Sequence, residues 1–174
     1  MNKLIAAIAF AADRHRNQRR KDEEASPYIN HPIALADVLA NEVGIEDERV
    51  IVAAVLHDTI EDTETTELEL LRLFGKDVAD IVLEVTDDKS LPKETRKRLQ
   101  VEHAAHISRR AKLVKLADKI CNLRDIAQHP PADWPLERKQ AYFDWAKSVV
   151  DRMRGVHPGL EAIFDAAYAT RPSE

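Results

Sequence analysis

The chain has 174 residues, of which 44% are hydrophobic and 33% charged, and its formal net charge is −5 at pH 7. This length fits one domain with a sizeable core, and the acidic balance argues against a broad nucleic-acid-binding surface. The single Cys121 excludes an internal disulfide and favours a reducing, cytoplasmic compartment. No apolar run is long enough to span a membrane.

The composition favours helices. Ala, Leu, Glu, Lys and Arg dominate, and no alternating strand pattern of useful length is present. We therefore predict a single all-α domain over residues 1–174, a helical bundle of about eight to ten helices. The Ala-rich start is short for a signal peptide, and its apolar face continues into a charged segment. We interpret it as a first helix over residues 2–19.

The next elements are predicted from caps and apolar runs. The first helix is expected to end in a basic cluster that includes Arg20 and Lys21, and Asn30 is expected to cap a second helix that carries Pro32 in its first turn. A third helix is expected to open at Asp47 or Glu46. Six further helices are predicted at about residues 66–74, 77–85, 93–106, 108–128, 135–154 and 160–169.

The third predicted helix organises the chain. Its residues 50–56 carry no polar side chain, and the run ends at His57 and Asp58. A carboxylate buried there without a partner is costly, and a bound cation is the simplest partner. Glu61 and Asp62 follow within one turn. The alternative interpretation is a helix that ends in a solvated acidic turn.

A second informative stretch is the predicted helix over residues 108–128. Asp118 lies within its broad apolar surface, and Asn122 lies one turn further on the same side. An Asp in this position indicates a functional group, with a buried Asp paired to an Arg as the alternative. His31 stands at the start of the second helix.

His31, His57, Asp58 and Asp118 together form a mixed nitrogen and oxygen set. Such a set suits a divalent ion of intermediate hardness such as Mn²⁺, and no Cys pair is present to hold a structural zinc. Four protein ligands leave an octahedral ion positions for water and substrate. This is the requirement for metal-assisted hydrolysis.

Three motifs carry a resemblance. The segments YINHP at 28–32, LHDTIED at 56–62 and KLADKICNLRD at 115–125 resemble the hydrolase domain of RelA/SpoT homologues, within the HD-domain metal phosphohydrolases. VTDDK at 85–89 and KRLQ at 97–100 extend the likeness, which runs nearly end to end. The length is similar to that of the stand-alone small alarmone hydrolases of metazoa and bacteria.

The resemblance implies a reaction and a set of roles. Members of the family use Mn²⁺ to remove the 3′-pyrophosphate of guanosine tetra- and pentaphosphate, which yields GDP or GTP and pyrophosphate. It implies that the metal ligands are His31, His57, Asp58 and Asp118, and that Glu61 and Asp62 activate or orient the attacking water. The implied substrate contacts are Arg20, Lys21, Lys93, Asn122, Arg138 and Tyr142. No room is left for a synthetase domain, so we expect no alarmone synthesis.

Two rival functions remain open from the sequence. One is a different HD phosphohydrolase that acts on another nucleotide, such as a nucleoside monophosphate. The other is a non-catalytic nucleotide-binding HD module, which would have no use for a complete water-activating set. We expect no nucleic-acid or membrane partner. The oligomeric state stays open, with a homodimer as one alternative.

Overall fold

The fold was analysed on a computed structural model that describes residues 2–173. Within this range the chain forms ten α-helices and a π-helical segment, η1, and the only pairing of extended backbone is an isolated bridge between Arg19 and Pro27. The predicted all-α class is thereby confirmed. No helix of the described residues is both long and apolar enough to cross a bilayer. The bounds are α1 Asn2–Arg14, α2 Asn30–Asp37, η1 Val38–Glu42, α3 Glu48–Leu56, α4 Thr59–Asp62, α5 Glu67–Phe74, α6 Lys76–Val85, α7 Lys93–His103, α8 Arg109–Gln128, α9 Leu136–Asp151 and α10 Pro158–Tyr168.

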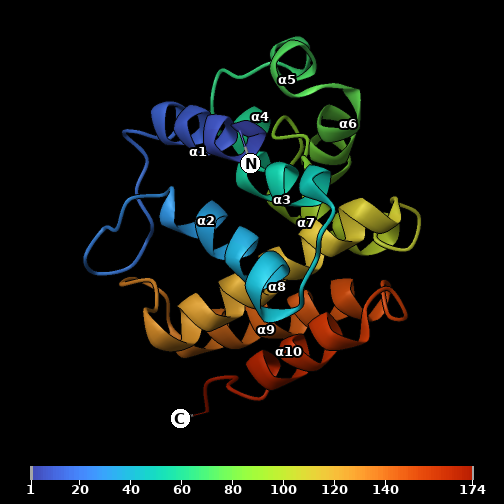
Figure 1. The fold of residues 1–174 in the computed structure, drawn as a ribbon. Coiled ribbons are helices and arrows are strands. Elements are labelled where there is room, and N and C mark those ends of the chain that lie inside the picture. Colours follow the sequence, from blue (N-terminus) through green and yellow to red (C-terminus); the bar gives the residue numbers. More distant parts are fainter. Residues whose placement is uncertain (1, 174) are drawn as a thin grey trace.

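Helix α3 lies at the centre of the bundle. It begins where the side chain of Asp47 accepts the backbone N–H of Arg49, as the sequence predicted. Every side chain from Val50 to Leu56 is buried, because α3 packs against α1, α2, α6 and α8. Figure 1 shows α3 between α1 and α6 above and α8 below. Helix α3 therefore ends inside the bundle, and the polar residues that follow Leu56 lie in the interior.

Helix α8 is the longest helix among the described residues and runs beside α3. The Ser108 hydroxyl accepts the N–H of Ala111 and starts it. Eleven of its 20 residues are buried, including Lys115 and Lys119. Helices α9 and α10 pack on α8 at the end of the molecule opposite α5 (Figure 1). Two buried ammonium groups on a core helix indicate a polar site at its surface.

The first helix is shorter than the sequence predicted. α1 ends at Arg14 rather than Arg19, because the chain then turns and forms the bridge to Pro27. The N–H of Arg20 donates to the Ser26 carbonyl at 2.8 Å, which holds this segment away from helical geometry. Asn30 does not cap α2 either. It is the first helical residue, and the cap position before it makes no side-chain hydrogen bond.

Helix α7 is attached differently from the others. None of its residues is buried, and it packs mainly on α9. The Trp145 indole of α9 donates a hydrogen bond to the Lys97 carbonyl at 3.1 Å, and the Lys97 ammonium lies over the same ring, 5.3 Å from its centroid. Helix α7 is therefore a polar wall held against the bundle by a few specific contacts.

Candidate metal centre and substrate cleft

Three side chains from three helical segments meet at the centre of the candidate site. His31 comes from the first turn of α2, His57 from the residue that follows α3, and Asp118 from the middle of α8. Their candidate ligand atoms all lie within 4.8 Å of one another. His31 Nε2 is 3.1 Å and His57 Nε2 3.9 Å from the same carboxylate oxygen of Asp118. The three groups could hold a divalent cation.

The orientation of His57 supports this interpretation. Its Nδ1 lies 2.8 Å from the carbonyl of Ala54, one turn back in α3, so a proton on Nδ1 leaves the Nε2 lone pair facing the site. That Nε2 is buried and faces carboxylate oxygens, 2.9 Å from Asp58 Oδ2 and 3.9 Å from Asp118 Oδ1. An imidazole nitrogen that faces two partly buried carboxylates suits a cation bound between the three groups.

Asp58 adjoins this group through His57. Its Oδ2 lies 2.9 Å from His57 Nε2, and the Tyr28 hydroxyl donates a hydrogen bond to the same oxygen. Asp58 belongs to the junction between α3 and the four-residue α4. The tyrosine therefore fixes which way the Asp58 carboxylate faces.

Opposing effects of burial and charge set the protonation of the centre. Burial lowers the pKa of His31. Burial alone would also lower the pKa of His57, but the Asp58 and Asp118 carboxylates outweigh it and raise the pKa to about 9. Burial alone would raise the pKa of Asp118, but Lys119 and His31 outweigh it and hold this pKa well below the usual range. The site thus keeps its carboxylates ionised, and a cation would have to displace a proton from His57.

Glu61 and Asp62 lie one turn beyond, on α4. Glu61 Oε1 accepts the backbone N–H of Asp87 at 2.7 Å, and burial raises the pKa of Glu61 to about 7. Asp62 accepts hydrogen bonds from Gln18, at 2.9 Å, and from the Lys89 ammonium. Glu61 can therefore exchange a proton near neutral pH, whereas Asp62 is held by two donors.

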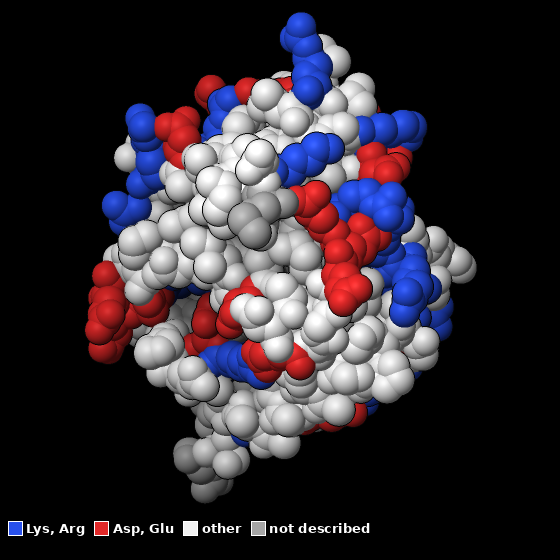
Figure 2. Space-filling view, in the orientation of Figure 1, with Lys and Arg blue, Asp and Glu red and all other residues white. Residues whose placement is uncertain are grey.

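A cleft opens over these residues. One cavity of about 510 Å³ is lined by His31, His57, Asp58, Glu61 and Asp118. A second of about 710 Å³ adjoins it and shares several of its walls. Eight cationic side chains line the first cavity: Arg20, Lys21, Lys93, Arg96, Lys97, Lys115, Lys119 and Arg138. On the face shown in Figure 2, acidic and basic groups are instead interspersed among uncharged surface.

All six predicted substrate contacts line this cleft. The Arg20 guanidinium lies 3.3 Å from Asn122 Oδ1 and 2.5 Å from Asp125, and Asn122 donates to Asp118 at 2.7 Å. The basic corner is therefore linked to the metal centre through one amide. Arg20 and Lys21 lie in the segment that follows the bridge at Arg19, not at the end of the first helix. Their predicted location at the end of the first helix is therefore wrong.

The other predicted contacts meet an aromatic wall. Arg138 stacks over Trp134, 4.3 Å from the ring centroid, and Tyr142 lies between Trp134 and Trp145 with ring centroids 5.9 and 5.2 Å away. Lys93 lines the same cavity. Planar cationic and aromatic groups at the edge of a polar cleft suit a nucleotide.

Several residues of the site had no predicted role. Tyr28, Lys115 and Lys119 stood inside the quoted motifs, where only their proximity to the histidines and Asp118 could have marked them. Lys119 Nζ is 3.1 Å from Asp118 and 4.3 Å from the Trp145 ring centroid. Gln18 and Trp134 carried no signal, because their contacts join segments that lie far apart in the sequence.

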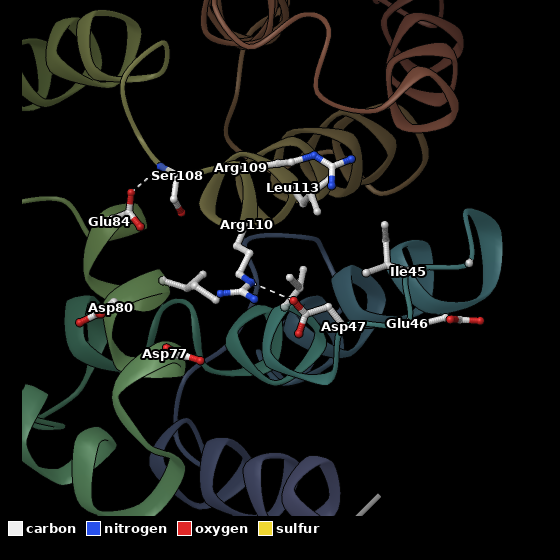
Figure 3. Close-up of a pocket in the computed structure, with 13 residues that line it drawn as sticks. Ile45, Glu46, Asp47, Asp77, Asp80, Glu84, Ser108, Arg109, Arg110 and Leu113 are labelled. Atoms are coloured by element: carbon white, nitrogen blue, oxygen red, sulfur yellow. Dashed lines mark hydrogen bonds and ion pairs between the residues drawn. The ribbon is translucent and has the colours of Figure 1, made fainter.

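Another cavity of about 720 Å³ lies between α3, α6 and the start of α8, and it shares no lining residue with the cleft. Figure 3 shows that acidic groups dominate it. Its Arg110 pairs with Asp47 at 2.8 Å, and Glu84 accepts the N–H of Ser108 at 2.6 Å. No histidine lines it, and its Asp77 and Asp80 carboxylates pair with Arg49 and Lys76. The chemistry therefore belongs to the cleft at His57.

The fold and the centre together define an all-α protein of the HD type, with a histidine–carboxylate centre in a cationic cleft. Comparisons with known proteins agree. The sequence pattern of the HD domain family matches residues 7–142. "Guanosine-3′,5′-bis(diphosphate) 3′-pyrophosphohydrolase MESH1" of Danio rerio is 56% identical over 97% of this chain and 93% of its own length. The human protein of the same name is 55% identical over 97% and 94%.

A solved structure gives the same result. The structure described as "A metazoan ortholog of SpoT hydrolyzes ppGpp and plays a role in starvation responses" superposes with a TM-score of 0.95 at 49% identity, covering 98% of this chain and 96% of that one. The chain therefore belongs to the HD-domain family and, within it, to the group of MESH1-type small hydrolases.

Proposed function

We propose that this protein hydrolyses guanosine tetra- and pentaphosphate at the 3′-pyrophosphate, giving GDP or GTP and pyrophosphate. The observation that supports this most directly is the meeting of His31, His57 and Asp118, whose candidate ligand atoms lie within 4.8 Å of one another in a cleft lined by eight cationic side chains. An acidic protein that concentrates cations in one cleft is suited to a small polyanion. The relatives named for this activity match nearly the whole chain.

We infer that the metal is Mn²⁺ and that His31, His57, Asp58 and Asp118 would hold it. When bound, the ion would supply Lewis-acid polarisation of a phosphoryl oxygen and a lower pKa for water. The protein contributes the orientation of these side chains. Ala54 fixes the His57 ring and Tyr28 fixes Asp58.

Glu61 is the group we assign to the proton of the attacking water. Hydrolysis forms a bond between the water oxygen and the phosphorus next to ribose O3′, and breaks the bond from that phosphorus to O3′. The water loses a proton to Glu61, and O3′ gains one as it leaves. A carboxyl with a pKa of about 7 is suited to this transfer at neutral pH. Asp62, held by Gln18 and Lys89, would orient the same water.

The remaining cleft residues would bind the nucleotide. Arg20 and Lys21 line both cavities, and Lys93 and Arg138 line the cavity at the metal centre. Asn122 stands between Arg20 and Asp118. Tyr142, within the aromatic wall, would contact the base or the ribose. The whole chain would act as one HD-type domain.

A panel of nucleotides tests the proposal. The protein is incubated with Mn²⁺ and guanosine tetraphosphate, GTP, or nucleoside monophosphates, and the products are resolved as pyrophosphate or orthophosphate. We expect GDP and intact pyrophosphate from guanosine tetraphosphate. Orthophosphate as the first product, or a preference for monophosphates, would support the rival HD phosphohydrolase. Binding without turnover of any nucleotide would support the non-catalytic module.

A further inference from the structure

A short chain of hydrogen bonds reaches Glu61 from the far wall of the cleft. Glu61 Oε1 accepts the backbone N–H of Asp87 at 2.7 Å. The Asp87 carboxylate in turn accepts the side-chain amide N–H of Gln100 at 2.6 Å. The three residues belong to α4, to the loop after α6 and to α7, so the chain joins elements that are separate in the sequence.

The amide of Gln100 can serve in only one orientation. Its Nε2 is the donor to Asp87, and a flipped amide would point Oε1 at a carboxylate and lose the bond. Oε1 is buried and has no hydrogen-bond partner among the described residues. Gln100 lines a cavity of about 190 Å³ together with Asp87, Arg96 and Lys115, and it also lines the cleft at the metal centre. A buried amide that leaves its own carbonyl unpaired has been placed for its donor.

The loop that carries Asp87 is fixed by few other contacts, one of which joins Lys89 to Asp62 of α4. Thr86 is anchored behind it by a hydrogen bond to the Val82 carbonyl at 2.7 Å. Ahead of it, Asp88 bonds within the loop, to Ser90. The Gln100 amide is thus the contact that holds the Asp87 side chain against α7. Release of that side chain would let the N–H that holds Glu61 shift.

We propose that Gln100 is a positioning residue for Glu61, acting through Asp87. It touches neither the metal centre nor the water itself. Its effect is to keep the Glu61 carboxylate at the one orientation from which it can accept the water proton. The proposal rests on the role given to Glu61 in the proposed function. Helix α7 also carries Lys93 and Lys97, which line the cleft, so the wall that meets the substrate phosphates also carries this contact.

The first test is Gln100→Leu, which keeps the size of the side chain and removes the donor. We expect kcat for guanosine tetraphosphate to fall about 10- to 100-fold, the weight of one hydrogen bond to a charged group. KM and bound Mn²⁺ should stay near those of the wild type, because the Gln100 amide donates to Asp87 and to none of the proposed metal ligands or substrate-binding residues. Arg98→Leu is the matched control on α7, since Arg98 is exposed and pairs with Glu102. An unchanged kcat in Gln100→Leu would overturn the proposal.

A double-mutant cycle separates positioning from a general loss of structure. In a Glu61→Gln background, adding Gln100→Leu should cost nothing further, because the group it positions is already gone. A full additional loss in that background would show that Gln100 acts elsewhere and overturn the proposal. Full activity in Glu61→Gln alone would instead refute the role of Glu61, so the two failures can be told apart.

Variants of Asp87 give an independent reading if Gln100→Leu folds poorly. Asp87→Asn keeps the backbone N–H and an oxygen that can accept from Gln100, so its kcat should stay near that of the wild type. Asp87→Ala removes the acceptor and should match the loss expected for Gln100→Leu. Equal activity of Asp87→Asn and Asp87→Ala, or a change in KM rather than kcat, would contradict the proposed network.

Discussion

At the scale of single residues, Glu61 illustrates how environment sets chemistry. Its neighbour Asp62 has the same functional group but is held by Gln18 and Lys89. Glu61 meets a single backbone N–H, and burial raises its pKa to about 7. Two adjacent carboxyl groups can therefore perform different tasks, one in proton transfer and one in orientation.

This difference predicts a pH dependence. A general base must be ionised, and the Glu61 carboxyl is protonated below its pKa, so kcat should rise with pH and level off above about 7. Below about pH 7, kcat should fall about tenfold for each pH unit, which gives the profile an acidic limb. The measurement is a kcat–pH profile at saturating Mn²⁺ and substrate. In Glu61→Gln the residual rate should lose this limb. A limb that persists unchanged would assign it to another group.

The Arg20 guanidinium gives a second prediction at this scale. It meets Asn122 and Asp125 at the edge of the cleft and makes no contact with His57 or Glu61. Arg20→Ala should raise KM for guanosine tetraphosphate more than it lowers kcat. The reason is that the proposed contact of Arg20 with the nucleotide is made in both the ground state and the transition state. Steady-state kinetics would detect this. Arg16→Ala, which removes an exposed cation paired with Asp13, is the matched control and should leave KM unchanged.

At the scale of elements, the site depends on where helices stop. Helix α3 ends at Leu56 and α4 begins at Thr59, so His57 and Asp58 occupy the junction between an apolar helix and a polar one. Thr59 closes this junction by donating its hydroxyl to the Leu56 carbonyl at 2.7 Å. A continuous helix would have turned successive side chains around its axis. The break between α3 and α4 allows His57 and Asp58 to face the same candidate metal centre.

The turn between α5 and α6 allows a prediction about such breaks. Gly75 has φ 90° and ψ 167°, a region that is essentially restricted to glycine. Gly75→Ala should cost about 1–3 kcal/mol of unfolding free energy, although an added Cβ would meet nothing within 4 Å. Gly44 has φ 68°, close to the φ of about 57° at which asparagine adopts the left-handed conformation.

Urea unfolding would measure the effect. Gly44→Asn should lower the midpoint less than Gly75→Asn, because only the second residue would be forced into a conformation closed to it. An equal loss at both positions would argue against a backbone origin and in favour of a lost contact.

At the scale of the whole molecule, the metal centre connects elements from the two halves of the chain. His31 and His57 come from α2 and from the end of α3, whereas Asp118 comes from α8. A cation that binds these groups only in the folded state adds its binding free energy to the stability of the fold. Stability is then linked to metal concentration.

We therefore expect Mn²⁺ to raise the Tm. At a free concentration 100 times the Kd, the gain is about 2.7 kcal/mol, and each kcal/mol should raise the Tm by about 2–4 °C in a protein of this size. A chelator should reverse the shift. His57→Ala should abolish both the shift and tight Mn²⁺ binding, whereas His106→Ala, at an exposed histidine, should not. A shift that survives in His57→Ala would refute the proposed ligand set.

The sequence by itself determined the fold class and much of the candidate site. Helical periodicity predicted the all-α bundle, and the apolar run of residues 50–56 marked α3 as its centre. The same run made the charged residues at its end anomalous, because a buried charge requires a partner. His57 and Asp58 were predicted on this basis, and His31 and Asp118 from their places at a helix end and on an apolar helix face. The fold brings His31, His57 and Asp118 within reach of one cation. A sequence pattern can predict a site residue when the apolar residues that mark it lie in the same helix.

Only the tertiary structure decided which residues meet across the chain. Tyr28 on Asp58, Lys89 on Asp62 and Gln100 on Asp87 join segments that no periodicity relates. The early end of α1 likewise follows from a bridge to a residue beyond the next turn. Such contacts depend on how helices pack, and side chains far apart in sequence become neighbours only when the core has fixed the positions of their backbones.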